Sequence, residues 1–169
     1  QAAWINIPHV TQFDEADITD LESLRGSLKD KAAAAGVKVT PLAFIVQAAA
    51  RAMREFPALN SQLDESGQNL IFKKFINIGF AADTPNGLLV PVIRDVTSKT
   101  ITQIAIELGT LSQKARDKKL SLDEMSGGVM SVTNLGGIGG TSFTPIVNQP
   151  EVAILGMSRG GIEPVWLGG

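Results

Sequence analysis

The sequence contains no cysteine and only one histidine among its 169 residues. The absence of cysteine excludes disulfides, thiolate metal sites and a cysteine nucleophile, and it fits a cytoplasmic protein. The single histidine, His9, lies in the segment IPHVTQF, where a lone histidine beside apolar residues is more typical of a packed or capping side chain than of a catalytic base. No pair of carboxylates stands out as an acid/base couple, so residue chemistry alone does not give a complete active site.

Long apolar runs and strong charge are also missing. No apolar stretch approaches the ~20 residues of a membrane span, and the N-terminus does not read as a signal peptide. The formal net charge is −2 and Lys and Arg are scattered, so we expect no nucleic acid partner. The carboxylates between Asp14 and Asp20 have no histidine beside them and suit a helix N-terminus, so we expect no metal.

What the chain does contain is typical of one globular α/β domain. It has 44% hydrophobic residues and 17 glycines, and helical and strand patterns alternate without a repeat or a low-complexity linker. We therefore expect a single domain over residues 1–169. Because the chain begins with Gln1 rather than Met, we expect it to be a piece of a longer protein.

Three helices are predicted. The first covers Thr19 to Ala35, with a capping box from Thr19 to Glu22 and Gly36 as its C-cap. The second follows the N-cap and first-turn proline Thr40-Pro41, ends before Pro57, and should be buried. The third follows Thr100 and ends near Lys118-Lys119. Their apolar stripes are Leu21, Leu24 and Leu28; Phe44, Ala48, Ala52 and Phe56; and Ile101, Ile104, Leu108 and Leu111.

Strands are predicted in two zones of the chain. The first zone contains LIFKKF, INIGFAAD and LLVPVIRDV, with a turn from Asp83 to Gly87, and the second contains VMSVTN, VAILGM and IEPVW. Between the zones, Ser121 to Glu124 indicates a short capped turn.

The glycine-rich stretch VTNLGGIGGTSF, residues 132–143, could be a phosphate-binding loop, a linker or a turn between strands. The dinucleotide fingerprint fails because Ser142 stands where its third glycine would fall. A Walker A loop fails because no Gly-Lys-Ser/Thr follows. A β-turn or bulge between strands is the simpler interpretation.

The order of several segments resembles a known family. IPHVTQFDEADIT, INIGFAADTPNGLLVPVIRDV, QKARDKKLSLDEMSGG and MSVTNLGGIGGTSFTPIVNQPEVAILGMSRGGIEPVW are similar to the catalytic domain of the dihydrolipoamide acyltransferases, the core components of the 2-oxo acid dehydrogenase complexes. Within it, DTPNGL and LGGIGGTSFTPIVN resemble the acetyl-transferring, pyruvate dehydrogenase branch of bacterial type.

The resemblance implies the fold of chloramphenicol acetyltransferase, a mixed sheet flanked by helices, in trimers that build a larger core. It implies acetyl transfer between coenzyme A and a dihydrolipoyl group carried on a separate lipoyl domain, in a channel between subunits. The implied partners are copies of the chain, lipoyl domains, and the decarboxylase and dihydrolipoamide dehydrogenase components.

The resemblance also assigns three residues of this chain. Thr133 matches the hydroxyl that donates to the developing oxyanion, with an ordinary strand threonine as the alternative. Arg25 matches a position suited to the coenzyme A phosphates, with a solvent-exposed helix arginine as the alternative. Asp83 matches a segment near the channel, with a turn cap as the alternative.

One family feature is missing from the printed sequence. The family carries its general base near the C-terminus in the motif His-x-x-x-Asp-Gly, which these 169 residues do not contain. His9 falls in a segment that is an N-terminal interface element in the family, so it does not replace that base. We therefore expect an acyltransferase domain that is incomplete at its C-terminus and inactive as given, with exposed apolar side chains such as Val165 and Trp166. The alternative is a purely structural, self-assembling core fragment.

Overall fold

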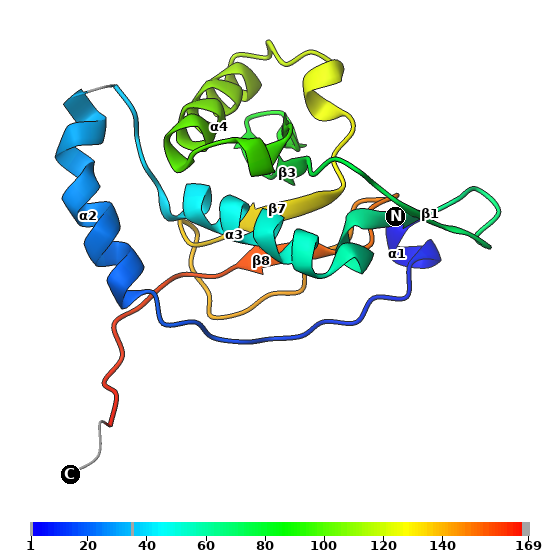
Figure 1. Ribbon diagram of the computed structural model, residues 1–169, viewed down its shortest axis with the longest axis horizontal. Coiled ribbons are helices and arrows are strands. Elements are labelled where there is room, and N and C mark those ends of the chain that lie inside the picture. Colours follow the sequence, from blue (N-terminus) through cyan, green and yellow to red (C-terminus); the bar gives the residue numbers. More distant parts are fainter. Residues whose placement is uncertain (1, 35, 167–169) are drawn as a thin grey trace.

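The computed structural model describes residues 2–34 and 36–166. Its helices are α1 (Ala2–Asn6), α2 (Thr19–Ala34), α3 (Pro41–Glu55) and α4 (Ile101–Arg116), with 3₁₀ turns η1 (Pro57–Asn60), η2 (Val96–Ser98) and η3 (Asp123–Met125). Its strands are β1 (Ser61–Leu63), β2 (Leu70–Phe72), β3 (Ile78–Phe80), β4 (Ala82–Thr84), β5 (Gly87–Leu89), β6 (Val92–Ile93), β7 (Met130–Asn134) and β8 (Ile154–Met157). Strands β1 to β6 lie between α3 and α4, and β7 and β8 follow α4, so the chain combines helices and strands as the predicted α/β class requires (Figure 1).

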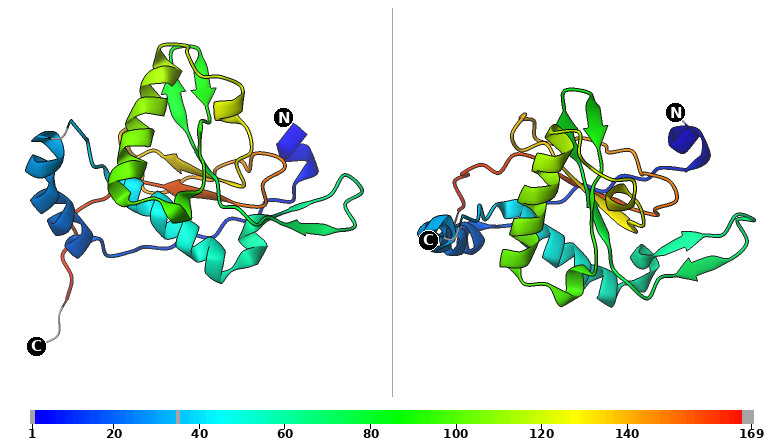
Figure 2. Two further views of the ribbon diagram at one scale, coloured as in Figure 1. Left: turned by 45° about the horizontal axis from the view of Figure 1, so that its top comes forward. Right: turned by 90° about the horizontal axis from the view of Figure 1, so that it is seen from above.

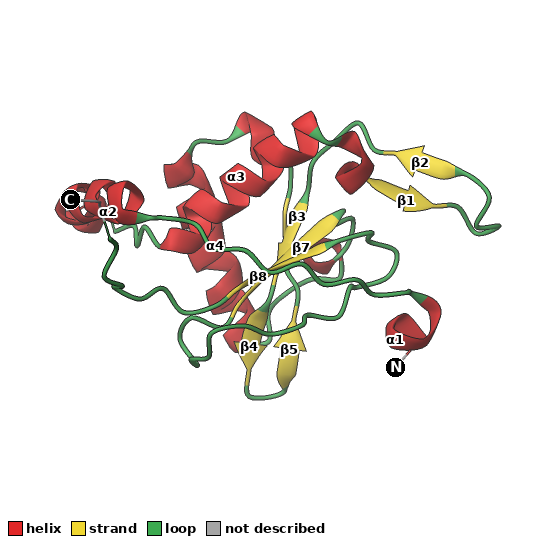
Figure 3. Ribbon diagram, turned by 90° about the horizontal axis from the view of Figure 1, so that it is seen from below, coloured by secondary structure: helices red, strands yellow, loops and turns green. Residues whose placement is uncertain are grey.

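The central sheet has the strand order β6-β3-β7-β8. β3 runs antiparallel to β6 and parallel to β7, and β7 runs parallel to β8. The hairpins β1–β2 and β4–β5 lie outside this sheet (Figure 3). The predicted mixed sheet flanked by helices is therefore confirmed.

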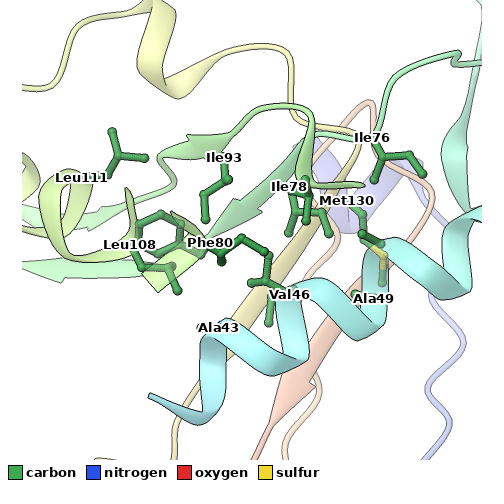
Figure 4. Packing of buried hydrophobic residues seen from close by; sticks show 14 of the residues in the cluster. Ala43, Val46, Ala49, Ile76, Ile78, Phe80, Ile93, Leu108, Leu111 and Met130 are labelled. Atoms are coloured by element: carbon green, nitrogen blue, oxygen red, sulfur yellow. The ribbon is translucent and has the colours of Figure 1, made fainter. Parts of the chain in front are cut away.

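The hydrophobic core lies between one face of the sheet and the helices α3 and α4 (Figure 4). Ile78 and Phe80 of β3 and Met130 of β7 face Val46 of α3 and Leu108 of α4, and all five side chains are buried. Alternate residues of a strand point to opposite faces, so Gly79 and Ser131 belong to the other face of the sheet. That second face carries the candidate site described below.

Helix α3 is buried as predicted, but through a different stripe. The fully buried positions are Ala43, Val46, Ala50 and Met53. Of the predicted stripe, Phe44 is also buried, whereas Ala48 and Phe56 are exposed. Both sets have helical spacing, and the alanine-rich sequence offers apolar residues on several sides. The position of the sheet, which the helix sequence does not contain, decides which side is buried.

Helix α4 agrees with the sequence on its buried face. Ile104, Leu108 and Leu111 are buried, and Thr100 forms a capping box with Gln103 at its N-terminus. The helix ends at Arg116, and Lys118 then adopts a positive φ of 58°. The predicted capped turn that follows is also present, because Ser121 and Glu124 exchange hydrogen bonds between side chain and backbone N–H.

Helix α2 begins at Thr19 as predicted, but the predicted capping box does not form. The Asp17 carboxylate accepts the Thr19 N–H at 2.9 Å, while Glu22 binds Arg25 instead of turning back to the helix start. Hydrogen bonds from Thr19 lower the pKa of Asp17. At the other end Gly36 has a φ of 70°, which a residue without Cβ adopts readily, so the predicted C-cap is confirmed.

Several connecting segments are irregular. The chain between α1 and α2 runs along the lower side of the molecule, past β8, to α2, which stands apart from the sheet (Figures 1 and 2).

The predicted strand IEPVW is wrong, because residues 162–166 form no strand. Val165 and Trp166 are exposed, as expected. Within the described ranges, no helix is long and apolar enough to cross a membrane.

Candidate functional site at the ends of two parallel strands

The candidate site lies where the parallel strands β3 and β7 end. Phe80 pairs with Val132, and the next N–H of the chain, that of Ala81, donates to the Val132 carbonyl at 3.0 Å. The hairpin β4–β5 therefore leaves the sheet at the edge where β7 ends, one residue after Thr133. Crevices at the carboxyl ends of parallel strands are common places for ligands in α/β proteins.

Thr133 lies on the sheet face away from α3 and α4. It is half-buried and pairs with Gly156 of β8. Its hydroxyl makes no hydrogen bond to any residue that the structure describes. Because the side chain is only half-buried, this hydroxyl can donate to solvent or to a ligand.

The glycine segment after Thr133 forms a turn that is held by its own hydrogen bonds. The Asn134 side chain accepts the Gly136 N–H at 2.8 Å, and the Leu135 carbonyl accepts the N–H groups of Ile138 and Gly139. A Cβ at Gly136 would lie 2.9 Å from the Asn134 side chain. The turn interpretation is therefore confirmed, although this close packing holds at Gly136 and not at every glycine of the segment.

A buried carboxyl group lies on the same sheet face. Glu151 is only 7% exposed, and its Oε1 accepts a 2.8 Å hydrogen bond from the hydroxyl of Ser131, two residues before Thr133. The other oxygen, Oε2, is buried without a partner among the described residues. Burial raises the pKa of Glu151, while the hydrogen bond from Ser131 opposes that rise.

Arg25 lines an open hollow of about 510 Å³ between α2 and the chain leading into α3. Lys29 and Lys38 also line it, and no carboxylate is among its lining residues. The guanidinium of Arg25 binds the Glu22 carboxylate at 2.6 Å, and this contact raises the pKa of Arg25. Arg25 is thus a partly exposed cation held in place on its helix, in a hollow suited to an anion.

Asp83 is exposed on β4, opposite Leu88 of β5. The turn of this hairpin is held by Thr84, whose hydroxyl donates to the Gly87 carbonyl at 2.7 Å and accepts the Asn86 N–H at 3.2 Å. The alternative interpretation of Asp83 as the turn cap is therefore wrong, since Thr84 does this. Asp83 stays available at the edge of the sheet where β3 and β7 end.

His9 is a packed and capping residue, as its sequence context indicates. Its Nε2 accepts the Val147 N–H at 2.9 Å, so Nδ1 carries the proton and donates to the Ile7 carbonyl at 2.8 Å. The Trp4 ring lies against it with centroids 5.1 Å apart. Both ring nitrogens are occupied, so His9 joins the N-terminal segment to the chain that follows the glycine turn.

The three predicted site residues lie on three separate elements. Thr133 and Asp83 belong to the same end of the sheet, whereas Arg25 lies on α2, and no hydrogen bond or ion pair joins any two of them in the described ranges. Sequence reasoning missed Glu151, because nothing in NQPEVA distinguishes a buried carboxyl from an exposed one. It also missed Lys38, which approaches Arg25 only because the chain turns back after α2.

Comparison with known proteins identifies one family over the whole chain. The family described as "2-oxoacid dehydrogenases acyltransferase (catalytic domain)" matches residues 1–169. The dihydrolipoyllysine-residue acetyltransferase component of the pyruvate dehydrogenase complex of Pseudomonas aeruginosa is 55% identical over 166 residues. That match covers 98% of this chain and 30% of the relative, so the chain spans less than a third of that protein.

Two solved structures are similar to the chain throughout. One belongs to the Azotobacter vinelandii dihydrolipoamide acetyltransferase, investigated for the roles of a serine, a histidine and an asparagine in its catalytic mechanism. The other is the cubic core of the pyruvate dehydrogenase multienzyme complex. Each is 54% identical, has a TM-score of 0.96, and is matched over 98% of this chain and 68% of its own. The similarity extends to the mixed sheet and the helices that flank it.

Proposed function

Because the chain belongs to the acyltransferase family of the 2-oxo acid dehydrogenases, we propose that it is part of an enzyme that transfers an acetyl group between coenzyme A and a dihydrolipoyl group. The observation that carries this proposal is the position of Thr133. A half-buried hydroxyl that makes no hydrogen bond to the described residues lies one residue before the end of a strand of the central sheet, in a chain of this family. We place this activity in the pyruvate dehydrogenase complex, of which the relative from Pseudomonas aeruginosa is a component. The lack of cysteine suits a protein of the cytoplasm.

The role proposed for Thr133 is to stabilise developing negative charge. A thiolate that attacks the acetyl thioester turns its carbonyl oxygen into an oxyanion, and the thiolate of the leaving thiol departs when the carbonyl reforms. The Thr133 hydroxyl donates a hydrogen bond to that oxygen. Such a donor acts most strongly where water is excluded, and the half-buried position of Thr133 favours this. The general base that prepares the thiolate is expected in a His-x-x-x-Asp-Gly motif, which the printed residues do not include.

Arg25 is the proposed contact for the phosphates of coenzyme A. Lys29 and Lys38 line the same hollow, and three cations without a carboxylate in the lining suit a ligand with several phosphate groups. The contact with Glu22 orders the guanidinium before a ligand arrives and leaves one of its terminal nitrogens for a phosphate. Asp83 is proposed to border the path of the other substrate, because it is exposed at the edge where Thr133 lies.

We also propose that copies of the chain assemble, as a trimer within a larger core, beside lipoyl domains and the other two enzyme components. The support is the apolar stripe of α2, which the chain itself does not cover. Leu24 is 51% exposed and Leu28 36% exposed, and none of the described residues of this helix is buried. Large exposed apolar side chains on a well-formed helix indicate a partner surface.

The test of the proposed function is acetyl transfer from acetyl-coenzyme A to dihydrolipoamide. The native-length protein, its Thr133→Ala variant and the 169-residue chain are assayed side by side. We expect the native-length protein to be active and the 169-residue chain to be slower by about 10²–10⁴, the factor attributed to a general base. A native-length protein without transfer activity contradicts the proposal.

The alternative is a core fragment that assembles without reacting. Analytical ultracentrifugation of the 169-residue chain distinguishes the two functions when it is combined with the assay. Oligomers without any transfer activity, in both chain lengths, support the structural alternative. Activity in the native-length protein that depends on Thr133 excludes it for the whole protein.

A further inference from the structure

The strongest feature that the proposed function does not use is the carboxyl group of Glu151. It is 7% exposed, with one oxygen bonded to Ser131 and the other without a partner in the part of the chain that the structure describes. A buried carboxyl with half of its hydrogen-bonding capacity unused is destabilising by itself. A residue of this kind indicates a role that an apolar side chain of the same size could not fill.

The hydrogen-bond partner of Glu151 lies on the same strand as Thr133. Ser131 and Thr133 are alternate residues of β7, so their side chains point to the same face of the sheet. A Cβ at Gly79 would lie 3.0 Å from the Ser131 hydroxyl, tighter than an ordinary van der Waals contact, so the glycine leaves room for this side chain.

Glu151 also holds a covering segment of the chain in place. It ends the segment 143–151, which follows the glycine turn and returns toward β8. At the start of this segment the Phe143 ring lies over Gly156, the residue paired with Thr133. Near its end the Glu151 N–H donates to the Asn148 carbonyl. The hydrogen bond between Ser131 and Glu151 therefore fastens the segment that covers this face to the strand that carries Thr133.

We propose that Glu151 is a positioning residue for Thr133, which acts through Ser131 by fixing β7 against the covering segment. The inference rests on the proposed function of Thr133 as the oxyanion donor. An oxyanion donor must be held within a fraction of an ångström of its working position, because small displacements weaken catalysis strongly. The hydrogen bond between Ser131 and Glu151 supplies this restraint on the face of the sheet to which the Thr133 side chain points.

The chemistry of the carboxyl suggests the most informative variants. Because burial favours the neutral form of Glu151, a glutamine of the same shape, which also accepts from Ser131, imitates it. Alanine removes the contact altogether. Glu65, exposed in the turn between β1 and β2, provides a matched control, since Glu65→Ala removes a carboxyl that supports nothing in the site.

The experiment measures kcat and KM for acetyl transfer by the native-length protein and by Glu151→Ala, Glu151→Gln and Glu65→Ala, below the thermal midpoint of each. We expect Glu151→Ala to lower kcat about 10- to 100-fold, as misplacement of a catalytic group does, with both KM values within about threefold. Glu151→Gln retains most of kcat. Should Glu151→Ala not fold, Ser131→Ala removes the same hydrogen bond and is expected to lower kcat alike. The proposal is overturned if a variant folds, lacks the hydrogen bond between Ser131 and Glu151, and yet has the same kcat as Glu65→Ala.

Hydrogen exchange gives a second readout that does not depend on the reaction. In Glu151→Ala, deuterium uptake should rise in peptides covering 130–134 and 143–150 and stay unchanged in the β1–β2 hairpin. If the parent protein transfers no acetyl group, the proposed function fails, yet this readout still tests whether Glu151 restrains the strand of Thr133. Unchanged uptake in both peptides overturns the positioning role, whatever the activity.

Discussion

Thr133 and Gly156 face each other across the parallel strands β7 and β8. Gly156 has no side chain. A Cβ placed on it would lie 2.7 Å from Cζ of Phe143, so the Phe143 ring occupies the space that a side chain would need. An aromatic ring from the segment after the glycine turn therefore covers the residue that pairs with Thr133. This relationship joins the two ends of the glycine-rich stretch 132–143 to strand β8.

Gly156→Ala tests this packing. The new methyl group must displace the Phe143 ring, so we expect a loss of about 1–3 kcal/mol in the free energy of unfolding, typical of overpacking. In a Phe143→Leu background the same substitution should be milder, because the ring atoms in the way are gone. Chemical denaturation of the four proteins measures both effects. Equal losses in the two backgrounds would show that the ring does not fill the space over Gly156.

Thr133→Ala tests the hydroxyl itself. Loss of an oxyanion donor lowers kcat by about 10²–10³, and we expect this decrease in the native-length protein with KM values little changed. Thr133→Ser keeps a hydroxyl on the same strand and should retain most of the rate. Thr133→Val has nearly the shape of threonine and serves as the steric control. A valine variant as fast as the wild type is incompatible with the proposed role.

Much of the fold could be predicted from local patterns. The start of α3 at Thr40-Pro41, the buried stripe of α4 and the C-cap at Gly36 depend on neighbouring residues, which a sequence shows directly, although the Thr40 side chain makes no capping hydrogen bond to the described residues. The buried side of α3 could not be predicted, because its alanines permit several sides and only the sheet selects one. IEPVW resembles a strand in composition, but a strand also needs a partner strand.

The candidate site, too, could be predicted from the sequence only in part. Thr133 was assigned from the resemblance of SVTNLGG to the family, whereas the lack of a partner for its hydroxyl is visible only in the fold. Glu151 was not predicted, because its burial depends on a segment that returns across the sheet from 20 residues away. Likewise, the Asp17 carboxylate accepts the first N–H of α2 in place of the predicted capping box between Thr19 and Glu22. Backbone geometry decides which carboxylate reaches that end of the helix.

The pH dependence of stability should report the buried state of Glu151. Its pKa in the folded protein is raised above the ordinary value of 4.5, chiefly by burial. The stability associated with this group is therefore fully present below about pH 4.5 and is lost as the pH rises through the folded-state pKa. As the pH rises through this range, the wild type should lose thermal stability relative to Glu151→Gln, whose amide does not titrate. Melting curves measured at several pH values check this, with Glu65→Gln expected to follow the wild type. A constant difference between wild type and Glu151→Gln contradicts the assignment.

Arg25→Ala tests the cationic hollow. Hydrogen bonds to charged groups contribute about 1.5–3 kcal/mol, so we expect KM for acetyl-coenzyme A to rise roughly 10- to 100-fold. KM for dihydrolipoamide should stay close to that of the wild type, since this substrate carries no phosphate. Arg54→Ala, which removes an exposed cation at the end of α3, is the control. Steady-state kinetics with each substrate varied in turn gives all of these values. Equal changes in both KM values would point to a general disturbance of the protein.

His9→Ala tests whether the only histidine holds the N-terminal segment or takes part in the reaction. The hydrogen bond from Val147 to Nε2 is lost in this variant, and with a net value of about 1 kcal/mol its loss should speed exchange of the Val147 amide roughly fivefold. His9→Gln places an acceptor near the position of Nε2 and should restore part of the protection. If His9 only holds the segment, kcat for acetyl transfer stays within about threefold of the wild type, whereas loss of a general base lowers it by about 10²–10⁴. Hydrogen exchange followed by mass spectrometry, together with the transfer assay, separates these outcomes. A large fall in kcat without faster exchange at Val147 would make His9 a participant in the chemistry, because its contact with the backbone would then be dispensable.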